Sequence, residues 1–430
     1  MYSRKIQEDF DCRMTGNSFS SFIFDRVWGT VLFTFLFSLA CAQDANRDRP
    51  ATPDYKIQLD VISSGYNGID TWFHPHAGII PKKGTNEVVL TMQKWLISRS
   101  DVFFALSHLK SKDLGKTWSD PMANPKTLGR VSMANGLEMG LSDFSPKWHY
   151  KTKKLLGTGH TIPYKDNHHA KNERRYTAWS VYDDKKKCWS AWLPLKIPDS
   201  NMFYDAGAGS TQRVDLSNGD ILLPIYFKAR NASVYNATVL RCRFDGKKLS
   251  YVAHGNVLSH PTGRGFPEPS LTFYKHHFYL TLRNDSAAYV AVSKDGLHFS
   301  KPKIWRFDDG KDLGSYNTQQ HWVTHNDGLF LVYTRRSTDN DNVVRHRAPL
   351  FIAQIDPERL VVIRASERVL VPNKGAQLGN FGVVNVNENE TWVTTSEGMS
   401  ERQPTKYGAD GRVYAAKIIW MKPNHHWNKY

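Results

Sequence analysis

The stretch SKDLGKTW at residues 111–118 recurs along the chain, and this repeat is the strongest constraint on the fold. Weaker copies keep an aspartate in a turn, as in SVYDDKKKCW at 180–189 and SKDGLHF at 293–299. The aspartates that anchor the five copies are Asp113, Asp183, Asp245, Asp295 and Asp356. Successive anchors lie about 50 to 70 residues apart, a spacing typical of a β-propeller in which each repeat forms a blade of about four strands.

Short runs rich in Val, Ile, Leu, Tyr, Phe and Trp fill the space between the anchors and alternate with Gly, Asn, Asp and Pro turns. These runs are predicted strands, at 86–97, 102–111, 220–229, 277–285, 287–296, 329–336 and 349–356. No long stretch has the 3.6-residue period of an amphipathic helix. The sequence therefore predicts an all-β fold, a six-bladed β-propeller, in which residues 55–63 supply the outer strand of the last blade and close the ring.

The repeated turn itself is predicted to be structural. An aspartate in such a turn accepts hydrogen bonds from backbone amides, and a glycine adopts backbone angles that other residues disfavour. The Trp or Phe that follows is expected to pack between sheets. We therefore expect Asp113 and its counterparts to stabilise the fold without taking part in chemistry.

An apolar run at residues 27–42 ends in Ala40-Cys41-Ala42 and is short for a membrane span. This pattern predicts a signal peptide cleaved near Ala42, so residues 1–42 are a signal peptide with an N-terminal extension and 43–430 form a single domain. The alternative is a membrane anchor. Cleavage would leave a secreted or periplasmic protein with no membrane span. Two cysteines would remain, Cys188 and Cys242, which are too few for a disulfide framework even if they pair.

The chain carries a formal net charge of +16. Such an excess attracts polyanions. An exported protein without a long run of Lys and Arg is not expected to bind nucleic acid. We expect the partner to be an acidic carbohydrate, such as a sialic acid or a uronate.

The Ser-x-Asp-x-Gly-x-Thr-Trp motif at 111–118 resembles the Asp box, also called the BNR repeat, of the sialidase superfamily. FPEPSLTFYKHHFYLTLRND at 266–285 resembles a segment of bacterial sialidase-like proteins that runs from a glutamate to an arginine. Together the two resemblances cover most of the mature chain as a fold and only part of the active site. They imply a sialidase-like propeller.

In a propeller, the start of each inner strand and the end of the next strand meet at one rim, so polar residues there are expected to converge. Polar residues at the inner-strand starts are His74, His76, Asp143, Asp205, Gln212, Glu268, Gln320, His321 and Asn380. Polar residues at the second-strand ends are Gln93, Lys94, His160, Tyr226, Lys228, Arg283, Arg335, Arg336 and Glu397. Strand ends are often polar because they reach water, which explains the lysines well. It explains His74, Glu268 and Arg283 less well, since each lies in an apolar stretch.

The family resemblance implies roles for some of these residues. Sialidases bind the substrate carboxylate with three arginines, whose planar guanidinium groups match a carboxylate. Arg283 resembles the second of these arginines and Arg335 the third. Glu268 resembles the family's glutamate, and Asp101 resembles its acid/base aspartate or, equally well, a turn residue.

Two departures from the family concern its first arginine and its nucleophile. WFHPHAGIIP at 72–81 has His74 or His76 where the family has an arginine. GNFGVV at 379–384 has Asn380 where the family has a nucleophilic tyrosine. The candidate catalytic residues are therefore Asp101, Glu268, His74 and His160. The candidate substrate-binding residues are Arg283, Arg335, His76, Gln93, Gln212, Gln320, His321 and Asn380.

The expected function is hydrolysis of a terminal glycosidic bond next to an acidic sugar, without a metal or other cofactor. An inverting hydrolase needs two acid/base groups and no tyrosine. Two alternatives remain open. The first is a polysaccharide lyase, with a histidine as the base and arginines that neutralise a uronate carboxylate. The second is a non-catalytic propeller that binds glycans.

Overall fold

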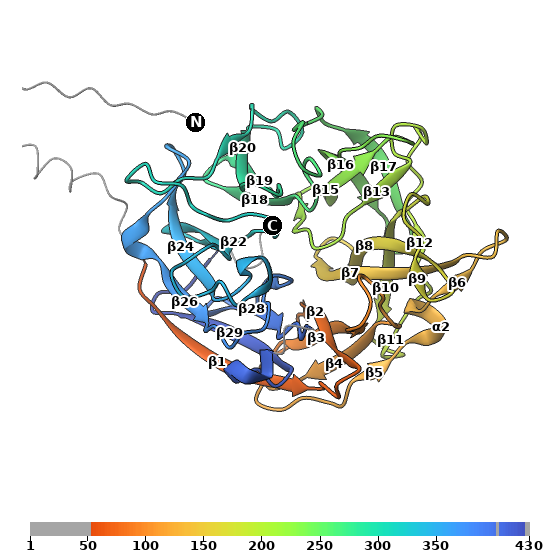
Figure 1. Cartoon of the computed structure of the whole chain (residues 1–430), viewed down its shortest axis with the longest axis horizontal. Helices are drawn as coiled ribbons and strands as arrows, with labels where there is room; N and C mark the ends of the chain where they lie inside the picture. Colours follow the sequence, from red (N-terminus) through yellow and green to blue (C-terminus); the bar gives the residue numbers. More distant parts are fainter. Residues whose placement is uncertain (1–52, 401–403, 426–430) are drawn as a thin grey trace, which may run out of the picture. The chain divides into compact units, whose positions relative to one another are not determined.

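Six antiparallel sheets build the part of the chain that the structure, a computed structural model, describes, namely residues 53–400 and 404–425. The sheets follow one another in chain order around a ring (Figure 1), which confirms the predicted all-β propeller. The predicted signal peptide and N-terminal extension, 1–42, lie outside the described residues. Among the described residues, no helix is long and apolar enough to cross a membrane.

Blades one to three come from the first half of the chain. Blade one contains β2 (Asp70–Ile80), β3 (Glu87–Leu96), β4 (Ser107–Ser111) and β5 (Met122–Ala123). Blade two contains β7 (Glu138–His149), β8 (Lys154–Lys165), β10 (Thr177–Asp183) and β11 (Cys188–Trp189), with the two-residue strands β6 (Val131–Ser132), β9 (His168–His169) and β12 (Leu193–Pro194). Blade three contains β13 (Asp205–Gly207), β14 (Val214–Asp215), β15 (Asp220–Lys228), β16 (Asn236–Phe244) and β17 (Leu249–His254).

Blades four to six complete the ring. Blade four contains β18 (Ser270–Tyr274), β19 (His277–Leu282), β20 (Tyr289–Ser293) and β21 (Lys303–Ile304). Blade five contains β22 (His321–His325), β23 (Gly328–Tyr333), β24 (Leu350–Asp356), β25 (Val361–Val362) and β26 (Arg368–Val371). Blade six contains β27 (Gly382–Asn385), β28 (Glu390–Ser396), β29 (Arg412–Trp420) and β1 (Tyr55–Ser64).

The ring closes through a pairing between the two ends of the described chain. Strand β1 pairs antiparallel with β29 along its whole length, from Tyr55 opposite Trp420 to Ser64 opposite Arg412. The prediction that 55–63 supplies the outer strand of the last blade is confirmed. Blade six is therefore the one sheet that joins segments more than 300 residues apart, which holds the first and last blades together.

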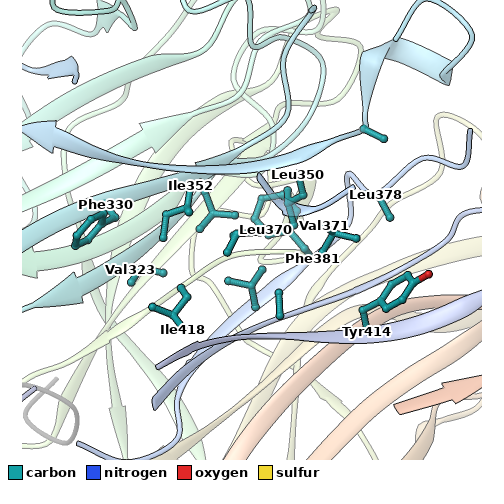
Figure 2. Close-up of a cluster of buried hydrophobic side chains, with 14 of the residues drawn as sticks. Val323, Phe330, Leu350, Ile352, Leu370, Val371, Leu378, Phe381, Tyr414 and Ile418 are labelled. Atoms are coloured by element: carbon teal, nitrogen blue, oxygen red, sulfur yellow. The ribbon is translucent and has the colours of Figure 1, made fainter. Parts of the chain in front are cut away.

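Each boundary between neighbouring blades has its own buried apolar cluster. Figure 2 shows the cluster between blades five and six, where Phe330 and Ile352 face Phe381 and Ile418. A middle strand such as β3 is buried on both faces, because a neighbouring blade covers each side. This two-sided burial explains why the sequence shows continuous apolar runs in place of alternation.

The anchor aspartates make the turns that the sequence predicts. In four copies the Oδ1 atom accepts the N–H groups of the residues two and three positions later, with Asp183, Asp245, Asp295 and Asp356 as acceptors. In the full motif, Asp113 accepts the N–H of Thr117 at 2.9 Å and its hydroxyl at 2.6 Å. All five turns join the third and fourth strands of a blade, so the structural role predicted for them is confirmed.

The structure differs from the sequence-based expectation in blade one. Residues 102–111 were expected to form one strand, but only 107–111 do so. Residues 102–106 instead form a connection in which Phe103 makes a single bridge to Trp95. Cys188 and Cys242 both have free thiols and lie in different blades.

We predict that Asp113→Ala lowers the midpoint of thermal unfolding by a few degrees. The hydroxyl and N–H of Thr117 and the hydroxyl of Ser111 lower the pKa of Asp113 to about 2, so the turn depends on the ionised carboxylate. Asp120→Ala is the matched control, because Asp120 is exposed and forms no ion pair with a described residue. Calorimetry of both variants tests this, and equal midpoints would refute it.

Candidate active site

Five blades share an unusual backbone conformation where the chain enters the inner strand. The residue there is not glycine, yet its φ is positive, at His74 (52°), Asp143 (50°), Ser210 (49°), Glu268 (51°) and Asn317 (50°). This conformation is unfavourable for residues with a side chain and is concentrated at functional sites. In blades one and two it lies in a bulge that interrupts the inner strand, and a bulge redirects a side chain. These five side chains interact with one another or with the same partner, as described next.

Asp143 joins three blades. Its Oδ1 atom lies 2.6 Å from Nε2 of His74 and accepts a hydrogen bond from the Ser210 hydroxyl at 2.8 Å. Its Oδ2 atom lies 3.6 Å from Nδ1 of His160. Burial disfavours the charged form, but the adjacent His74 outweighs it and holds the pKa of Asp143 well below its usual range. Asp143 is therefore a buried carboxylate that orients His74 and lies next to His160.

His74 also contacts blade six. The amide Nδ2 of Asn380 lies 2.7 Å from Nε2 of His74. The Nδ1 atom of His74 is buried and has no hydrogen-bond partner in the described part of the chain. If Asp143 accepts the hydrogen of Nε2, Nδ1 carries a free lone pair, because a neutral imidazole has one N–H. In that tautomer the amide of Asn380 turns its oxygen, and not the donor Nδ2, towards Nε2.

His160 and Tyr226 form a buried pair next to this network. The Tyr226 hydroxyl lies 3.1 Å from Nδ1 of His160. Burial is the main reason that the pKa of His160 falls to about 4, so its ring is neutral at pH 7. Burial also raises the pKa of Tyr226 far above its usual value, so the hydroxyl keeps its proton.

A second network lies at the starts of blades four and five. One guanidinium nitrogen of Arg283 binds Glu268, and another donates to Oδ1 of Asn317 at 2.7 Å. Arg264 donates to the same oxygen at 2.7 Å and forms an ion pair with Asp285. Arg283 is only 4% exposed, and its Nε atom has no hydrogen-bond partner among the described residues.

Arg347 lies beside Arg283 without a counterion. It is 4% exposed and donates to the backbone oxygen of Asn317 at 2.6 Å and to the side chain of Gln377 at 3.3 Å. No carboxylate of the described residues forms an ion pair with it. Burial, followed by the charges of Arg283 and Arg345, lowers the pKa of Arg347 far below its usual value, and the charge of Glu268 opposes this only in part.

Arg335 forms an ion pair with a carboxylate of its own blade. Its guanidinium binds both oxygens of Glu367, at 2.6 and 2.9 Å, and lies over the ring of Phe351. The structure therefore brings Arg347 next to Arg283, while Arg335 has a carboxylate partner within its own blade. The role of Arg335 in binding substrate stays a prediction.

Asp101 lies on the connection between β3 and β4 and has a positive φ of 57°. Its side chain is 60% exposed, and Oδ2 lies 3.9 Å from Nδ1 of His169. Burial lowers the pKa of Arg345, then Arg283 and Arg264 lower it further, and Asp101 raises it. The charge of Asp101 thus acts on the cluster of arginines across the rim.

Three other predicted residues line the central channel. His76, Gln212 and His321 surround a cavity of about 150 Å³ inside the ring of inner strands. His76 bonds Ser145 at 3.0 Å and His321 bonds Ser270 at 2.6 Å, each through Nδ1. These side chains lie deeper along the axis than the positions with positive φ.

Two predicted glutamines are buried and bond to neither network. Gln320 accepts a hydrogen bond from the Thr281 hydroxyl at 3.0 Å. Gln93 is fully buried, and neither atom of its amide has a partner in the described ranges. Their roles as ligands of a substrate stay predictions. Within the described residues, no group of three or more His, Cys, Asp or Glu is arranged to hold a metal ion.

Sequence reasoning did not single out Ser210, Asn317, Arg345 or Arg347. Ser210 and Asn317 take part in the networks because of their backbone angles. Apart from glycine, the type of a residue does not by itself predict that its φ is positive. Arg345 and Arg347 follow the loop after Arg335, and nothing in their spacing favours them over it. Only the position of this loop shows which arginines lie together.

Comparison with solved structures shows a sialidase-like fold. The chain resembles the Trypanosoma rangeli sialidase in complex with the inhibitor DANA, with a TM-score of 0.55, 13% identity, and coverage of 82% of this chain and 55% of that one. It also resembles the same sialidase in complex with sialic acid, with a TM-score of 0.54, 12% identity, and coverage of 86% and 59%. For the NanB sialidase from Streptococcus pneumoniae the TM-score is 0.55, at 9% identity, with coverage of 88% and 72%.

The chain therefore spans between half and two thirds of the length of the Trypanosoma rangeli sialidase. At these identities the likeness establishes the fold, and it confirms the predicted resemblance to the sialidase propeller. No protein-family model and no curated protein matches the sequence.

The lowered pKa values of three buried histidines predict how the free energy of unfolding depends on pH. Burial lowers the pKa to about 4 in His76 and His160 and to about 3 in His321, against about 6.5 in an unfolded chain. Above pH 6.5 these groups are neutral in both states and contribute nothing to the pH dependence. As the pH falls from about 6.5 towards 4, the unfolded state binds the protons first, so the free energy of unfolding decreases.

Urea unfolding at several pH values between 7 and 4 measures this dependence. His321→Gln should make the decrease shallower, because one such proton is removed. His276→Asn is the control, since His276 is exposed and forms no ion pair with a described residue, and asparagine tolerates its positive φ of 68°. Parallel curves for the wild type and His321→Gln would contradict the prediction.

Proposed function

We propose that this protein is a secreted or periplasmic glycoside hydrolase that removes a terminal acidic sugar from a glycan or polysaccharide. The observation that carries the proposal is Arg347, a buried guanidinium without a counterion beside Arg283. A buried charge without a partner is strongly destabilising, so its presence indicates a ligand that supplies the opposite charge. The planar guanidinium group favours a carboxylate. Arg283 supports the same reading, since its Nε atom also has no partner among the described residues.

Hydrolysis requires one group that protonates the leaving oxygen and another that activates water. Asp101 is exposed on a loop at the rim and is assigned the first role. His74 is assigned the second, because Asp143 orients its ring and Nδ1 has no described partner. Glu268, bound to Arg283, holds the arginine in place for the substrate. Asn380 has no hydroxyl, so the proposal uses water as the nucleophile.

The pair of His160 and Tyr226 favours a second candidate, a polysaccharide lyase. Elimination needs a neutral base, a proton donor and cations that neutralise the uronate carboxylate. His160 is neutral at pH 7 and Tyr226 keeps its proton, so the pair meets the first two needs. Arg283 and Arg347 meet the third.

Mass spectrometry of products distinguishes the two reactions. The mature protein is incubated with α-sialosides and with uronate-containing oligosaccharides. Hydrolysis adds one water across the broken bond and gives saturated products. Elimination gives an unsaturated product that is lighter by that water and would favour the lyase. No product from either set, together with binding of the same glycans, would favour a glycan-binding propeller.

We predict that Arg347→Met raises the KM for an acidic substrate by about tenfold to a hundredfold, because a charge-assisted contact contributes about 1.5–3 kcal/mol. The same change should leave the thermal midpoint equal or higher, since it removes an unpaired buried charge.

Arg335→Met is the matched control. It breaks the ion pair with Glu367, so it should lower the thermal midpoint and leave KM unchanged. Steady-state kinetics and thermal scans of both variants provide the test. A rise in KM for Arg335→Met alone would assign the carboxylate to Arg335 and overturn the role given to Arg347.

A further inference from the structure

The face of the propeller opposite the candidate active site carries a basic groove. The active-site residues lie at the starts of inner strands and the ends of second strands. The turns that join first to second strands, and third to fourth strands, therefore lie at the other face, because neighbouring strands are antiparallel. Between blades two and three, these turns border a groove of about 750 Å³.

Lysines line this groove from both blades. Lys151 and Lys154 come from the β7–β8 turn, and Lys247 comes from the β16–β17 turn. Lys153 and Lys248 lie next to them in the same turns and are exposed. None of these five lysines forms an ion pair with a described residue. Lys151 donates to the backbone oxygen of Asn218, which holds its ammonium group at the wall of the groove.

The two carboxylates of the groove offset only part of the charge of these lysines. Asp220 binds Arg241 at 2.6 Å and Arg243 at 3.3 Å. Asp245 accepts the backbone N–H groups of Lys247 and Lys248, at 2.8 and 2.7 Å, as the anchor of its turn. Asp220 is thus paired with two arginines, and the charge of Asp245 acts on Lys247. The five lysines outnumber this one remaining carboxylate, so the groove stays positive.

We propose that this groove binds an acidic polysaccharide at a site separate from the active site. The positive side chains from both blades along one groove match the regularly spaced carboxylates of such a polymer. A membrane surface would require protruding apolar residues, but the groove is concave and its exposed residues are charged. Single-stranded nucleic acid is bound on a series of exposed aromatic platforms, but Phe244, the one aromatic side chain in the lining of the groove, is buried.

The proposed site would hold a polymer on one face while the other face stays open. The groove gives the polymer an attachment point that does not depend on the reaction. When a polymer is bound at one site, its effective concentration at a second site on the same protein rises. The inference goes beyond the proposed function and stands apart from it. Binding at the groove by a protein with no catalytic activity would still support the inference. Hydrolysis or elimination at the active site would be equally compatible with it.

Fluorescence anisotropy with labelled polygalacturonate tests the site. The groove variant is Lys151→Gln/Lys154→Gln/Lys247→Gln. The control is Lys56→Gln/Lys303→Gln/Lys406→Gln, which removes the same charge from exposed lysines elsewhere. At low ionic strength the groove variant should bind at least about tenfold more weakly and depend less on salt, and the control should stay within about twofold of the wild type. Equal losses in both variants, or no loss in the groove variant, would overturn the proposal.

A measurement on the wild-type protein needs no variant. Acetylation of lysines, followed by peptide mass spectrometry, should show that polygalacturonate protects Lys151, Lys154 and Lys247 but leaves Lys56 and Lys303 reactive. Equal protection of all the exposed lysines would overturn the proposal that the groove is the binding site. If a single-stranded oligonucleotide of matched charge bound more tightly than polygalacturonate, the proposal that the ligand is an acidic polysaccharide would be wrong.

Discussion

Closure of the ring by β1 and β29 is the interaction on which the rest of the structure depends. It joins the first described strand to the last, so each blade gains a neighbour on both sides and each boundary buries an apolar cluster. The two-sided burial lets middle strands be apolar throughout. Closure also brings His74 of blade one within 2.7 Å of Asn380 of blade six, so the candidate site exists only in the closed ring.

The candidate site contains backbone angles and a buried charge that are unfavourable by themselves, and the closed ring of sheets holds them in place. Five residues other than glycine at the entries of the inner strands have positive φ angles, and Arg347 is a buried cation without an ion-pair partner among the described residues. Each of these features opposes folding, and together they would not persist unless the surrounding sheets over-determined the backbone. Such features are expected where binding of an anionic ligand offsets the unfavourable energy. The same reasoning explains why replacing Arg347 is expected to weaken binding and preserve stability.

The two faces of the propeller differ in the kind of positive charge they carry. The active-site rim has arginines, buried and held by Asn317, Glu268 and Gln377, which suits a carboxylate in one orientation. The opposite face between blades two and three has exposed lysines on turns, which suits an extended polyanion without a fixed register. The positive charge of the chain is therefore proposed to act in two ways: arginines bind one carboxylate in the active site, and lysines bind an extended polyanion on the opposite face.

The sequence by itself determined the propeller, the closing strand and the structural role of the anchor aspartates, because these follow from local turn chemistry and from apolar runs that repeat along the chain. It also placed His74, His160, Glu268, Arg283 and Asn380 at strand ends that meet. Only the tertiary structure decided that Asp143 lies between two histidines and that Arg347 lies beside Arg283. The reason is physical: positive φ angles at residues other than glycine and the course of the loop before Arg347 are set by contacts between blades, which no local pattern records.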